Sequence, residues 1–376
     1  MKPIRILSII GIVVGTLLII SSSTLLFIHD NNRKDVLPAQ EDIYEYVPDI
    51  QETDKEEPPE DIIELEVVIR ESGWIPNWAF DLGYESLVNN KGVIDTVLPV
   101  LYTVDNSGNV VTRGVSEANI QKLLTYTREN NIRVIPTIGS YNTEAMDAHF
   151  ASTEAYNRNI YTIVAEIEKY GFDGIDLDYE MISSNNKDMY LLFLKDLRIE
   201  LKKKNKILSV TVFAQWDNGT YTDHQDTRIV QDYSRVGAFA DEVRIMAYDY
   251  TSSSSKVAGP IGPGNWIRDV LDYATKNIPK EKIWLGVHLY GYQWAPGKTT
   301  ALTYTTLNSV LNDPNTFGTF REDIGEGYLE YGCDGGRCIV YYQEPKGVQL
   351  RRDIAKEYGI AGISYWRLGG EMDILK

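Results

Sequence analysis

From residue 67 onward, short apolar runs rich in β-branched residues alternate with longer stretches whose apolar residues recur every three or four positions. Runs of the first kind are typical of buried strands, and stretches of the second kind are typical of amphipathic helices. Strands are predicted at residues 68–75, 94–102, 133–138, 173–179, 207–215, 243–249, 283–289 and 361–367. Helices are predicted between them, among others at residues 116–130, 153–170, 187–204, 227–240, 265–277 and 346–358.

This alternation predicts an α/β fold class. Strands that alternate with helices pair in parallel, and eight such units close into a (β/α)8 TIM barrel. An open, doubly wound sheet is the alternative, but no glycine-rich phosphate-binding turn follows the first strand. Residues 290–345 are too long for a plain loop. We therefore expect a small inserted α+β subdomain between strands seven and eight of a catalytic barrel that spans residues 67–376.

The N-terminal segment has a different pattern. Residues 6–28 form an uncharged apolar stretch that follows Lys2 and Arg5, and about 20 such residues cross a bilayer as a helix. A cleaved secretory signal is the alternative, but its apolar region is only about 7–15 residues long. We therefore predict a cytoplasmic stub and a single-pass transmembrane signal-anchor within residues 1–34, with the catalytic domain extracellular. If the segment were cleaved, the protein would be secreted.

The density of acidic residues distinguishes a linker segment from the barrel. Residues 35–66 contain thirteen acidic residues, one base and four prolines, a composition that does not support a packed core. We expect this segment to be an acidic, disordered spacer. Of the formal net charge of −17, only −8 belongs to residues 67–376. A mildly acidic domain without a basic stripe argues against nucleic acid as a partner, and we expect a monomer.

The two cysteines, Cys333 and Cys338, lie on a glycine-rich turn in the sequence YGCDGGRC. In an extracellular domain we expect them to form a small disulfide that closes a hairpin. A reactive thiol pair is the alternative, but no neighbouring His or Lys would lower a thiol pKa there. The four histidines are not at metal-ligand spacing, so the sequence predicts neither a metal nor a cofactor.

The candidate chemistry lies in the run Asp173–Glu180, DGIDLDYE. Because successive strand residues point to opposite faces, Asp176, Asp178 and Glu180 share one face, and the alternating apolar residues face the helices. The three acids are therefore expected to line the barrel interior. Like charges this close raise the pKa of at least one carboxyl and couple the titrations. A carboxyl that keeps its proton near neutral pH can act as a general acid.

The acidic run has two other possible interpretations. Three carboxylates could hold magnesium or calcium, but three acids on one strand make a poor octahedral cage, and Asp249 is the only further acid evident at a predicted strand end. A surface acid cluster does not fit the alternation with apolar residues inside a predicted central strand. Acid catalysis is the interpretation that we favour.

The run resembles the DGxDxDxE signature of glycoside hydrolase family 18, which includes chitinases and related N-acetylglucosaminidases. Thr137–Ser140 (TIGS) is similar to its SxGG motif, Met246–Asp249 (MAYD) to its MxYD motif, Lys282–Trp294 to its seventh strand and Gly362–Glu371 to its eighth. The matches extend over residues 70–376 in the family's order. Within the family, the C-terminal segments resemble bacterial spore-cortex and cell-wall hydrolases. Met181-Ile182 stand where typical chitinases have Tyr-Pro.

The resemblance implies retaining, substrate-assisted hydrolysis of β-1,4 linkages beside N-acetylglucosamine, in chitin-like or peptidoglycan chains. Glu180 would protonate the glycosidic oxygen and later activate water, while the acetamido oxygen of the substrate attacks the anomeric carbon. Asp178 would orient the acetamido group. Asp176 would lie deeper and share a proton or hydrogen bond with Asp178. Tyr248 would donate its hydroxyl to the acetamido oxygen.

The same resemblance suggests substrate-binding residues. Trp366 would form the apolar floor beneath the distorted sugar, and Met246 and Asp249 would shape the same pocket. Further candidates for stacking on sugar rings, each with ordinary packing as the alternative, are Trp78, Tyr292, Trp294 and Tyr342. A catalytically inactive, lectin-like member of the same fold is the alternative function, and a structural ectodomain is a third. Lectin-like members usually lose the terminal acid of the motif, whereas Glu180 is present here.

Overall fold

The computed structural model describes residues 68–376, apart from residues 218, 220–223, 314–315 and 372. The predicted signal-anchor at residues 6–28 and the predicted spacer at residues 35–66 lie outside the described residues. In the part of the chain that is described, no helix combines the length and the apolarity that a bilayer span requires.

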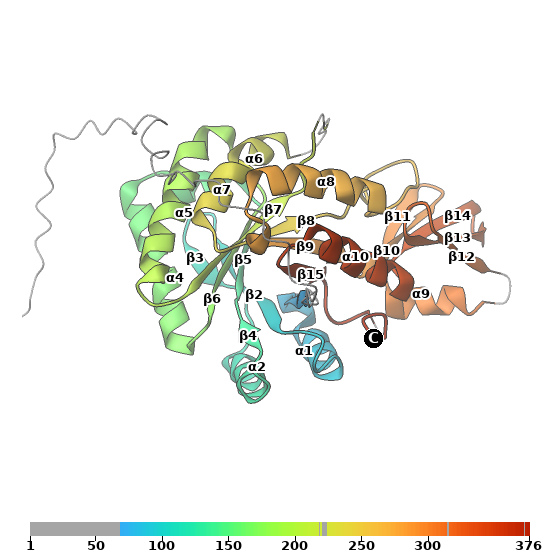
Figure 1. Ribbon diagram of the computed structural model, residues 1–376, viewed down its shortest axis with the longest axis horizontal. Coiled ribbons are helices and arrows are strands. Elements are labelled where there is room, and N and C mark those ends of the chain that lie inside the picture. Colours follow the sequence, from blue (N-terminus) through green and yellow to red (C-terminus); the bar gives the residue numbers. More distant parts are fainter. Residues whose placement is uncertain (1–67, 218, 220–223, 314–315, 372) are drawn as a thin grey trace, which may run out of the picture. The chain divides into compact units, whose positions relative to one another are not determined.

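Parallel strands close into an eight-stranded barrel surrounded by helices (Figure 1), which confirms the predicted barrel. β1 pairs with both β15 and β2, and these pairings close the ring. The barrel strands are β1 (Arg70–Ile75), β2 (Thr96–Val104), β5 (Thr137–Ser140), β6 (Gly174–Tyr179), β7 (Ile207–Phe213), β8 (Glu242–Met246), β9 (Ile283–His288) and β15 (Gly362–Trp366). Two short strands also pair with β2, namely β3 (Val110–Thr112) and β4 (Arg133–Val134).

Helices follow the barrel strands. The helices are α1 (Phe80–Asn89), α2 (Glu117–Glu129), α3 (Thr143–Phe150), α4 (Thr153–Tyr170), α5 (Lys187–Lys202), α6 (Gln225–Val230), α7 (Tyr233–Phe239), α8 (Gly264–Asn277) and α10 (Pro345–Tyr358). Of these, α2, α3, α4 and α7 begin at residues whose side chains cap them. The side chain of Ser152 accepts a hydrogen bond from the N–H of Ala155 at the start of α4, and the helix ends at Gly171 in the left-handed conformation. Serine and glycine are favoured at these two positions because they satisfy free backbone groups and tolerate positive φ, respectively.

Two predicted elements are interrupted in the structure. The helix predicted at residues 227–240 is two helices, because the carboxylate of Asp232 accepts hydrogen bonds from the N–H groups of Ser234 and Arg235 and so begins α7 anew. The strand predicted at residues 133–138 is divided into β4 and β5 at Pro136, whose nitrogen has no hydrogen to donate to a sheet.

The barrel has an apolar outer face and a polar interior. Ile175, Leu177 and Tyr179 on β6 are buried in the large apolar cluster that also includes residues from the surrounding helices. Inside the barrel, Ser72, Thr137, Asp176, Ser209, Thr211, Arg244 and Ser364 are all buried and polar. The alternation along β6 therefore places the acids on the interior side, as the period-two pattern predicts.

The predicted insertion at residues 290–345 is a five-stranded antiparallel sheet with one helix. In sheet order its strands are β11 (Lys298–Thr303), β10 (Tyr290–Ala295), β14 (Gly336–Tyr342), β13 (Glu326–Cys333) and β12 (Phe317–Arg321), and its helix is α9 (Tyr304–Leu311). Tyr342 lies in the small core of this subdomain with Leu307, Leu329 and Val340, which accounts for it as a packing residue.

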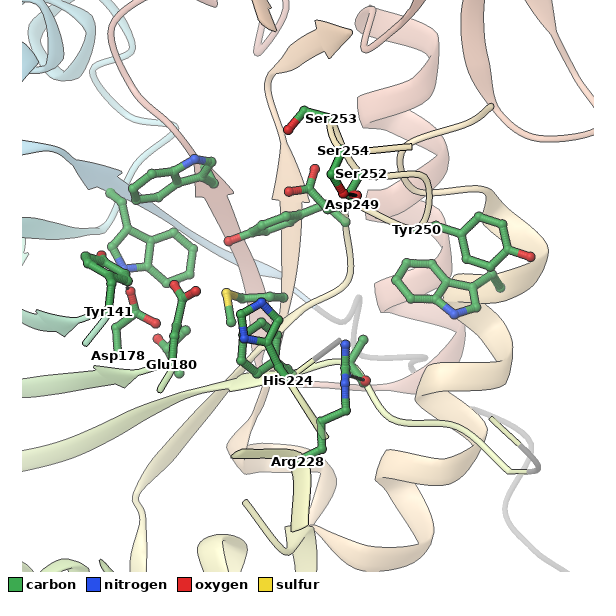
Figure 2. A pocket seen from close by; sticks show the side chains of 18 of the residues that line it. Tyr141, Asp178, Glu180, His224, Arg228, Asp249, Tyr250, Ser252, Ser253 and Ser254 are labelled. Carbon is green, nitrogen blue, oxygen red and sulfur yellow. Dashed lines mark hydrogen bonds between the residues drawn. The ribbon is translucent and has the colours of Figure 1, made fainter. Parts of the chain in front are cut away.

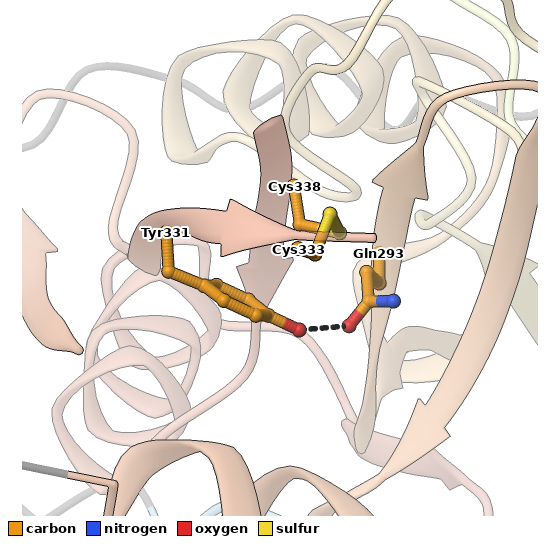
Figure 3. Close-up of a disulfide and its surroundings, with 4 residues drawn as sticks. All are labelled: Gln293, Tyr331, Cys333 and Cys338. Atoms are coloured by element: carbon orange, nitrogen blue, oxygen red, sulfur yellow. Dashed lines mark hydrogen bonds between the residues drawn. A yellow bond between two sulfur atoms is a disulfide. The ribbon is translucent and has the colours of Figure 1, made fainter. Parts of the chain in front are cut away.

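A disulfide joins Cys333 on β13 to Cys338 on β14, five positions apart in the sequence. Close to it, the hydroxyl of Tyr331 donates a hydrogen bond of 2.6 Å to the side-chain oxygen of Gln293 on β10 (Figure 3). The pairing closes the β13–β14 hairpin at its turn, where a covalent link limits fraying of the hairpin.

Candidate active site

The acidic run of β6 ends at the C-terminal mouth of the barrel. Asp176 and Asp178 belong to the strand, and Glu180 follows it by one residue. The backbone N–H of Glu180 donates to the carbonyl of Ser140, so the strand pairing with β5 continues up to the acid. In TIM-barrel enzymes, reactive groups are found at this end of the strands.

Asp176 lies deepest and is surrounded by donors from three other strands. Its Oδ1 accepts hydrogen bonds from the hydroxyls of Ser209 (2.8 Å) and Thr211 (3.1 Å) on β7. Its Oδ2 accepts from Thr137 on β5 (2.9 Å), from Thr211 and, more weakly, from the indole N–H of Trp74 on β1 (3.4 Å). These bonds and the charge of Arg244 partly oppose the effect of burial, which raises the pKa of Asp176.

The expected hydrogen bond between Asp176 and Asp178 is absent among the described contacts. Both oxygens of Asp176 are already occupied by the hydroxyl and indole donors. The hydrogen bond that the family resemblance implies is therefore not formed, because donors on adjoining strands take its place.

Asp178 and Glu180 form a coupled pair above Asp176. Burial, followed by the charges of Glu180 and Asp176, raises the pKa of Asp178 well above its usual range. The hydroxyl of Tyr141, at 3.2 Å from Oδ2, opposes this rise. Burial raises the pKa of Glu180 to about 7, with a smaller contribution from the charge of Asp249. At neutral pH such a pair retains a proton that a general acid can deliver.

The pair opens into a pocket of about 720 Å³ at the mouth of the barrel. Figure 2 shows Tyr141, Asp178 and Glu180 grouped on one side of this pocket and Asp249 across from them, beside the loop of Ser252, Ser253 and Ser254. Its size is within the range of small-ligand sites. Several of the residues predicted from the sequence line it, namely Trp78, Asp178, Glu180, Met246, Tyr248, Asp249 and Trp366.

The residues that follow β8 form one wall of the pocket. Burial raises the pKa of Tyr248 well above its usual range, so its hydroxyl stays protonated and able to donate. Asp249 has a left-handed backbone with a φ of 58°. Its carboxylate accepts hydrogen bonds from the hydroxyls of Tyr290 and Tyr292 on β10, the latter at 3.0 Å. The inserted subdomain thus holds Asp249 in place.

Three tryptophans, Trp74, Trp78 and Trp366, also line the pocket. The ring of Trp366, at the end of β15, has its centroid 6.1 Å from that of Trp74 and 6.3 Å from that of Trp78, both in edge-on geometry. Trp78 is 61% exposed, whereas Trp74 is buried. This group is an apolar surface of the kind that carries a sugar ring.

Tyr292 and Trp294, predicted to contact substrate, are not among the residues that line the pocket. Both are buried on β10 with Ile261. The indole N–H of Trp294 donates to the carbonyl of Ser255 at 3.0 Å, and Tyr292 donates to Asp249. Their contacts make them supports for the loop after β8, so the prediction of direct substrate contact does not match their positions.

Sequence reasoning missed several pocket residues. Trp74 lies at the C-terminal end of a predicted strand and Tyr141 lies three residues beyond the end of another, and these positions were a usable signal. At the far end of the pocket, the ring of Trp266 has its centroid 5.6 Å from that of Trp216 and 5.2 Å from that of Tyr250. Trp266 comes from α8, and nothing in its local pattern distinguishes it from a core residue.

No metal site is evident near these acids. Within the described part of the chain, no group of three or more His, Cys, Asp or Glu residues is arranged to hold a metal ion. The hydroxyl donors around Asp176 explain why stacked carboxylates are stable here, because they satisfy the carboxylate oxygens by hydrogen bonding.

Known proteins with similar sequences and structures include cortex-lytic enzymes and chitinases. The cortical fragment-lytic enzyme of Bacillus anthracis is 26% identical over 301 residues, which are 76% of this chain and 68% of that protein. Chitinase A1 of Niallia circulans is 23% identical over 305 residues, covering 67% of this chain and 43% of its own length.

Solved structures share the barrel. A chitinase from Chromobacterium violaceum superposes with a TM-score of 0.74 at 22% identity, covering 82% of this chain and 96% of that chain. The spore cortex-lytic enzyme SleL of Bacillus cereus has a TM-score of 0.72 at 19% identity, covering 82% and 73% of the two chains. At this identity the likeness concerns the fold.

A match to a family model assigns the chain to a family of enzymes. The model described as glycosyl hydrolases family 18 matches residues 90–371, a range that includes β6 and its acids, the segment after β8 and the end of β15. With that match over most of the described barrel, the chain belongs to glycosyl hydrolases family 18.

Proposed function

We propose that this protein hydrolyses β-1,4 bonds next to N-acetylglucosamine in a peptidoglycan or chitin-like chain, with Glu180 as acid and base. The observation that carries the proposal is the interacting pair of Asp178, which is buried, and Glu180, which is half-buried, in the lining of the pocket. Glu180 has the higher than usual pKa that a general acid needs at neutral pH. A carbohydrate-binding protein without catalysis has no use for such a proton.

In the proposed reaction the proton of Glu180 passes to the glycosidic oxygen as the glycosidic bond breaks. The acetamido oxygen of the same sugar forms a bond to the anomeric carbon, which gives a cyclic oxazolinium ion and frees the leaving chain. Glu180, now a carboxylate, then takes a proton from water as that water attacks the anomeric carbon. The ring opens, the anomeric configuration is retained, and Glu180 recovers its proton.

The neighbouring residues have complementary roles in this proposal. Asp178 accepts a hydrogen bond from the acetamido N–H and offsets the positive charge that develops on the ring. Tyr248 donates its hydroxyl to the acetamido oxygen, and Trp366 supports the apolar face of the reacting sugar. Groups preorganised in this way around a developing charge are typically worth factors of about 10²–10³ each in rate.

The pH dependence follows from the raised pKa of Glu180. The acid must be protonated to act, so activity persists up to its pKa and falls as the pH rises through about 7. We expect a bell-shaped profile of kcat/KM whose alkaline limb lies near that value. Initial rates on an N-acetylglucosamine oligomer across a pH series check this, and a rate that stays level well into the alkaline range would contradict the role of Glu180.

Product analysis tests the function itself. Purified peptidoglycan and chitin oligomers are digested separately, and the products are identified by mass spectrometry. We expect new reducing ends on N-acetylglucosamine in at least one digest, with retention of the anomeric configuration when the products are followed by NMR. Intact polymers in both digests, with the protein folded and bound to them, would favour the lectin-like alternative.

We also propose that residues 6–28 tether the barrel to the outer face of the cell membrane through the acidic spacer. This proposal rests on the uncharged apolar stretch and the bases before it. A membrane-held hydrolase would act on polymer next to the cell surface. Fractionation of cells that produce the full chain, with alkaline carbonate extraction, checks this: the full-length protein should stay in the membrane pellet.

A further inference from the structure

We propose that Tyr141 is a positioning residue of this site, whose hydroxyl holds Asp178 toward Glu180 and keeps one carboxylate oxygen of Asp178 available to the substrate. The inference rests on the proposed hydrolytic function and adds a residue to it. It is carried by the contact between the Tyr141 hydroxyl and Asp178 Oδ2, at 3.2 Å (Figure 2).

The path of the chain explains how Tyr141 reaches the acid. Tyr141 directly follows β5, and in the register of β5 with β6 the residue opposite Asp178 is Gly139. The tyrosine ring folds back over this glycine: a Cβ atom at position 139 would lie 2.5 Å from the Tyr141 hydroxyl oxygen and 3.0 Å from the adjoining ring carbon. Any side chain at that position would therefore displace the ring from its place beside Asp178.

A second contact holds the ring on its other side. The guanidinium carbon of Arg113 lies 5.5 Å from the centroid of the Tyr141 ring, within the range of a cation–π interaction. Arg113 is itself tied to the chain after β1, because its carbonyl accepts a hydrogen bond of 3.1 Å from the side chain of Asn77. The absence of a side chain at Gly139 thus leaves room for the tyrosine ring, and Arg113 contacts the ring and holds it there.

The hydrogen bonds around Asp178 determine which of its two oxygens stays available to the substrate. Asp176 is fully occupied by Thr137, Ser209, Thr211 and Trp74 and offers Asp178 no bond. Tyr141 occupies Oδ2 of Asp178. Oδ1 is buried and accepts no hydrogen bond of normal geometry from the described residues, but the Glu180 carboxyl is near enough to influence the pKa of Asp178 as a hydrogen-bonding neighbour. Oδ1 is the oxygen left to accept from a protonated Glu180 or from the acetamido N–H of a bound sugar, so the tyrosine hydroxyl sets which oxygen does so.

The charged and titratable groups around Asp178 determine the direction of the pH effect. They are Asp176 on β6 and Glu180 just after it, Tyr141 after β5, Tyr190 on α5, and Tyr248, Asp249 and the deeper Arg244 from β8 and the segment after it. A hydrogen bond from the Tyr141 hydroxyl favours the ionised form of Asp178 and lowers its pKa. Loss of the hydroxyl therefore raises that pKa and moves the acid limb of the activity profile to higher pH.

Tyr141→Phe tests the inference, because it removes the hydroxyl and keeps the ring. We expect kcat on an N-acetylglucosamine oligomer to fall about 10- to 100-fold, the range for losing a hydrogen bond to a charged group, with KM changed less than about 3-fold. The acid limb should move to higher pH, and the thermal midpoint should stay close to that of the wild type. Gly139→Ala, which displaces the ring instead, should move the limb in the same direction.

A double-mutant cycle separates positioning from general damage. In an Asp178→Ala background there is no side-chain oxygen to hold, so adding Tyr141→Phe should lower the residual rate by less than about 2-fold if the hydroxyl acts through Asp178. The inference would be overturned if adding Tyr141→Phe in that background lowered the rate as much as it does in the wild type. It would also be overturned if the acid limb of the pH profile did not move in Tyr141→Phe.

Direct titration makes the test independent of the hydrolytic function. Carboxyl ¹³C shifts of Asp178 followed by NMR should show a higher midpoint in Tyr141→Phe than in the wild type, whether or not any polymer is cleaved. An unchanged midpoint contradicts the positioning role. If the midpoint of Asp178 differs between the two proteins as expected but the wild type cleaves no polymer, the proposed function is contradicted and the positioning role is not.

Discussion

Replacing Glu180 by Gln is expected to lower kcat on an N-acetylglucosamine oligomer by about 10²–10⁴-fold, the usual contribution of a general acid. Glutamine has nearly the shape of glutamic acid, so the pocket keeps its volume and the backbone contacts of position 180 to Ser140 and Thr227 remain. What is lost is the proton for the glycosidic oxygen and the base that activates water. The measurement is the release of reducing ends under single-turnover conditions.

Binding distinguishes the catalytic role from a structural one. A thiazoline mimic of the oxazolinium ion should still bind the Glu180→Gln protein, because Asp178, Tyr248 and Trp366 still surround the acetamido group in the proposed complex. Glu154→Gln, on the exposed first turn of α4, is a matched control that should keep wild-type activity. A Glu180→Gln protein with full activity would falsify the assigned role. An inactive variant that also fails to bind the mimic would mean that the substitution damages the site as a whole.

Replacing Arg244 by Met is expected to lower the free energy of unfolding by about 3–5 kcal/mol, the usual effect of removing one member of a buried ion pair. Arg244 is completely buried on the inner face of β8. Its guanidinium pairs with Glu242, donates to the hydroxyls of Ser72, Ser209 and Ser364, and lies 4.4 Å from the centroid of the Trp284 ring. Methionine fills similar space but can neither pair with Glu242 nor donate to these hydroxyls.

The measurement is urea unfolding monitored by tryptophan fluorescence. Arg268→Met is the matched control, since Arg268 pairs with Glu357 on the surface with both side chains well exposed. Such pairs contribute at most about 1 kcal/mol. If both variants lost the same free energy of unfolding, the buried network would contribute no more to the stability of the barrel than a surface ion pair does. The loss should be smaller if Glu242 relaxes toward Arg133, its second partner at 2.8 Å.

Arg244 also affects the pKa of an acid that lies above it in the barrel. Its positive charge lowers the pKa of Asp176, and Ser209 bridges the two side chains by donating to Asp176 while accepting from Arg244. The polar floor of the barrel therefore supports both the fold and the charge balance beneath Asp178. This arrangement satisfies a buried acid by hydrogen bonds and an opposite charge, as low-dielectric interiors require.

The local pattern of the chain was enough to determine the barrel and its central acids. Strand and helix periodicity are properties of consecutive residues, so eight strands with intervening helices could be located before any contact was known. The alternation from Ile175 to Glu180 assigned the acids to the interior because a period of two leaves no other choice. Tyr248, Asp249 and Trp366 also line the pocket, but it was the resemblance to family motifs, and not periodicity, that singled them out.

Contacts between distant segments were decided only in the tertiary structure. Trp74 reaches Asp176 across 102 residues of sequence, Thr137 across 39 and Tyr141 reaches Asp178 across 37. These bonds depend on strand register and ring orientation, which no local pattern encodes. The same cause turned Tyr292 and Trp294 toward Asp249 and Ser255 and away from the pocket. Periodicity along the chain therefore identified the acids, while the packing of neighbouring strands determined which groups hold them and which of their oxygens stay available.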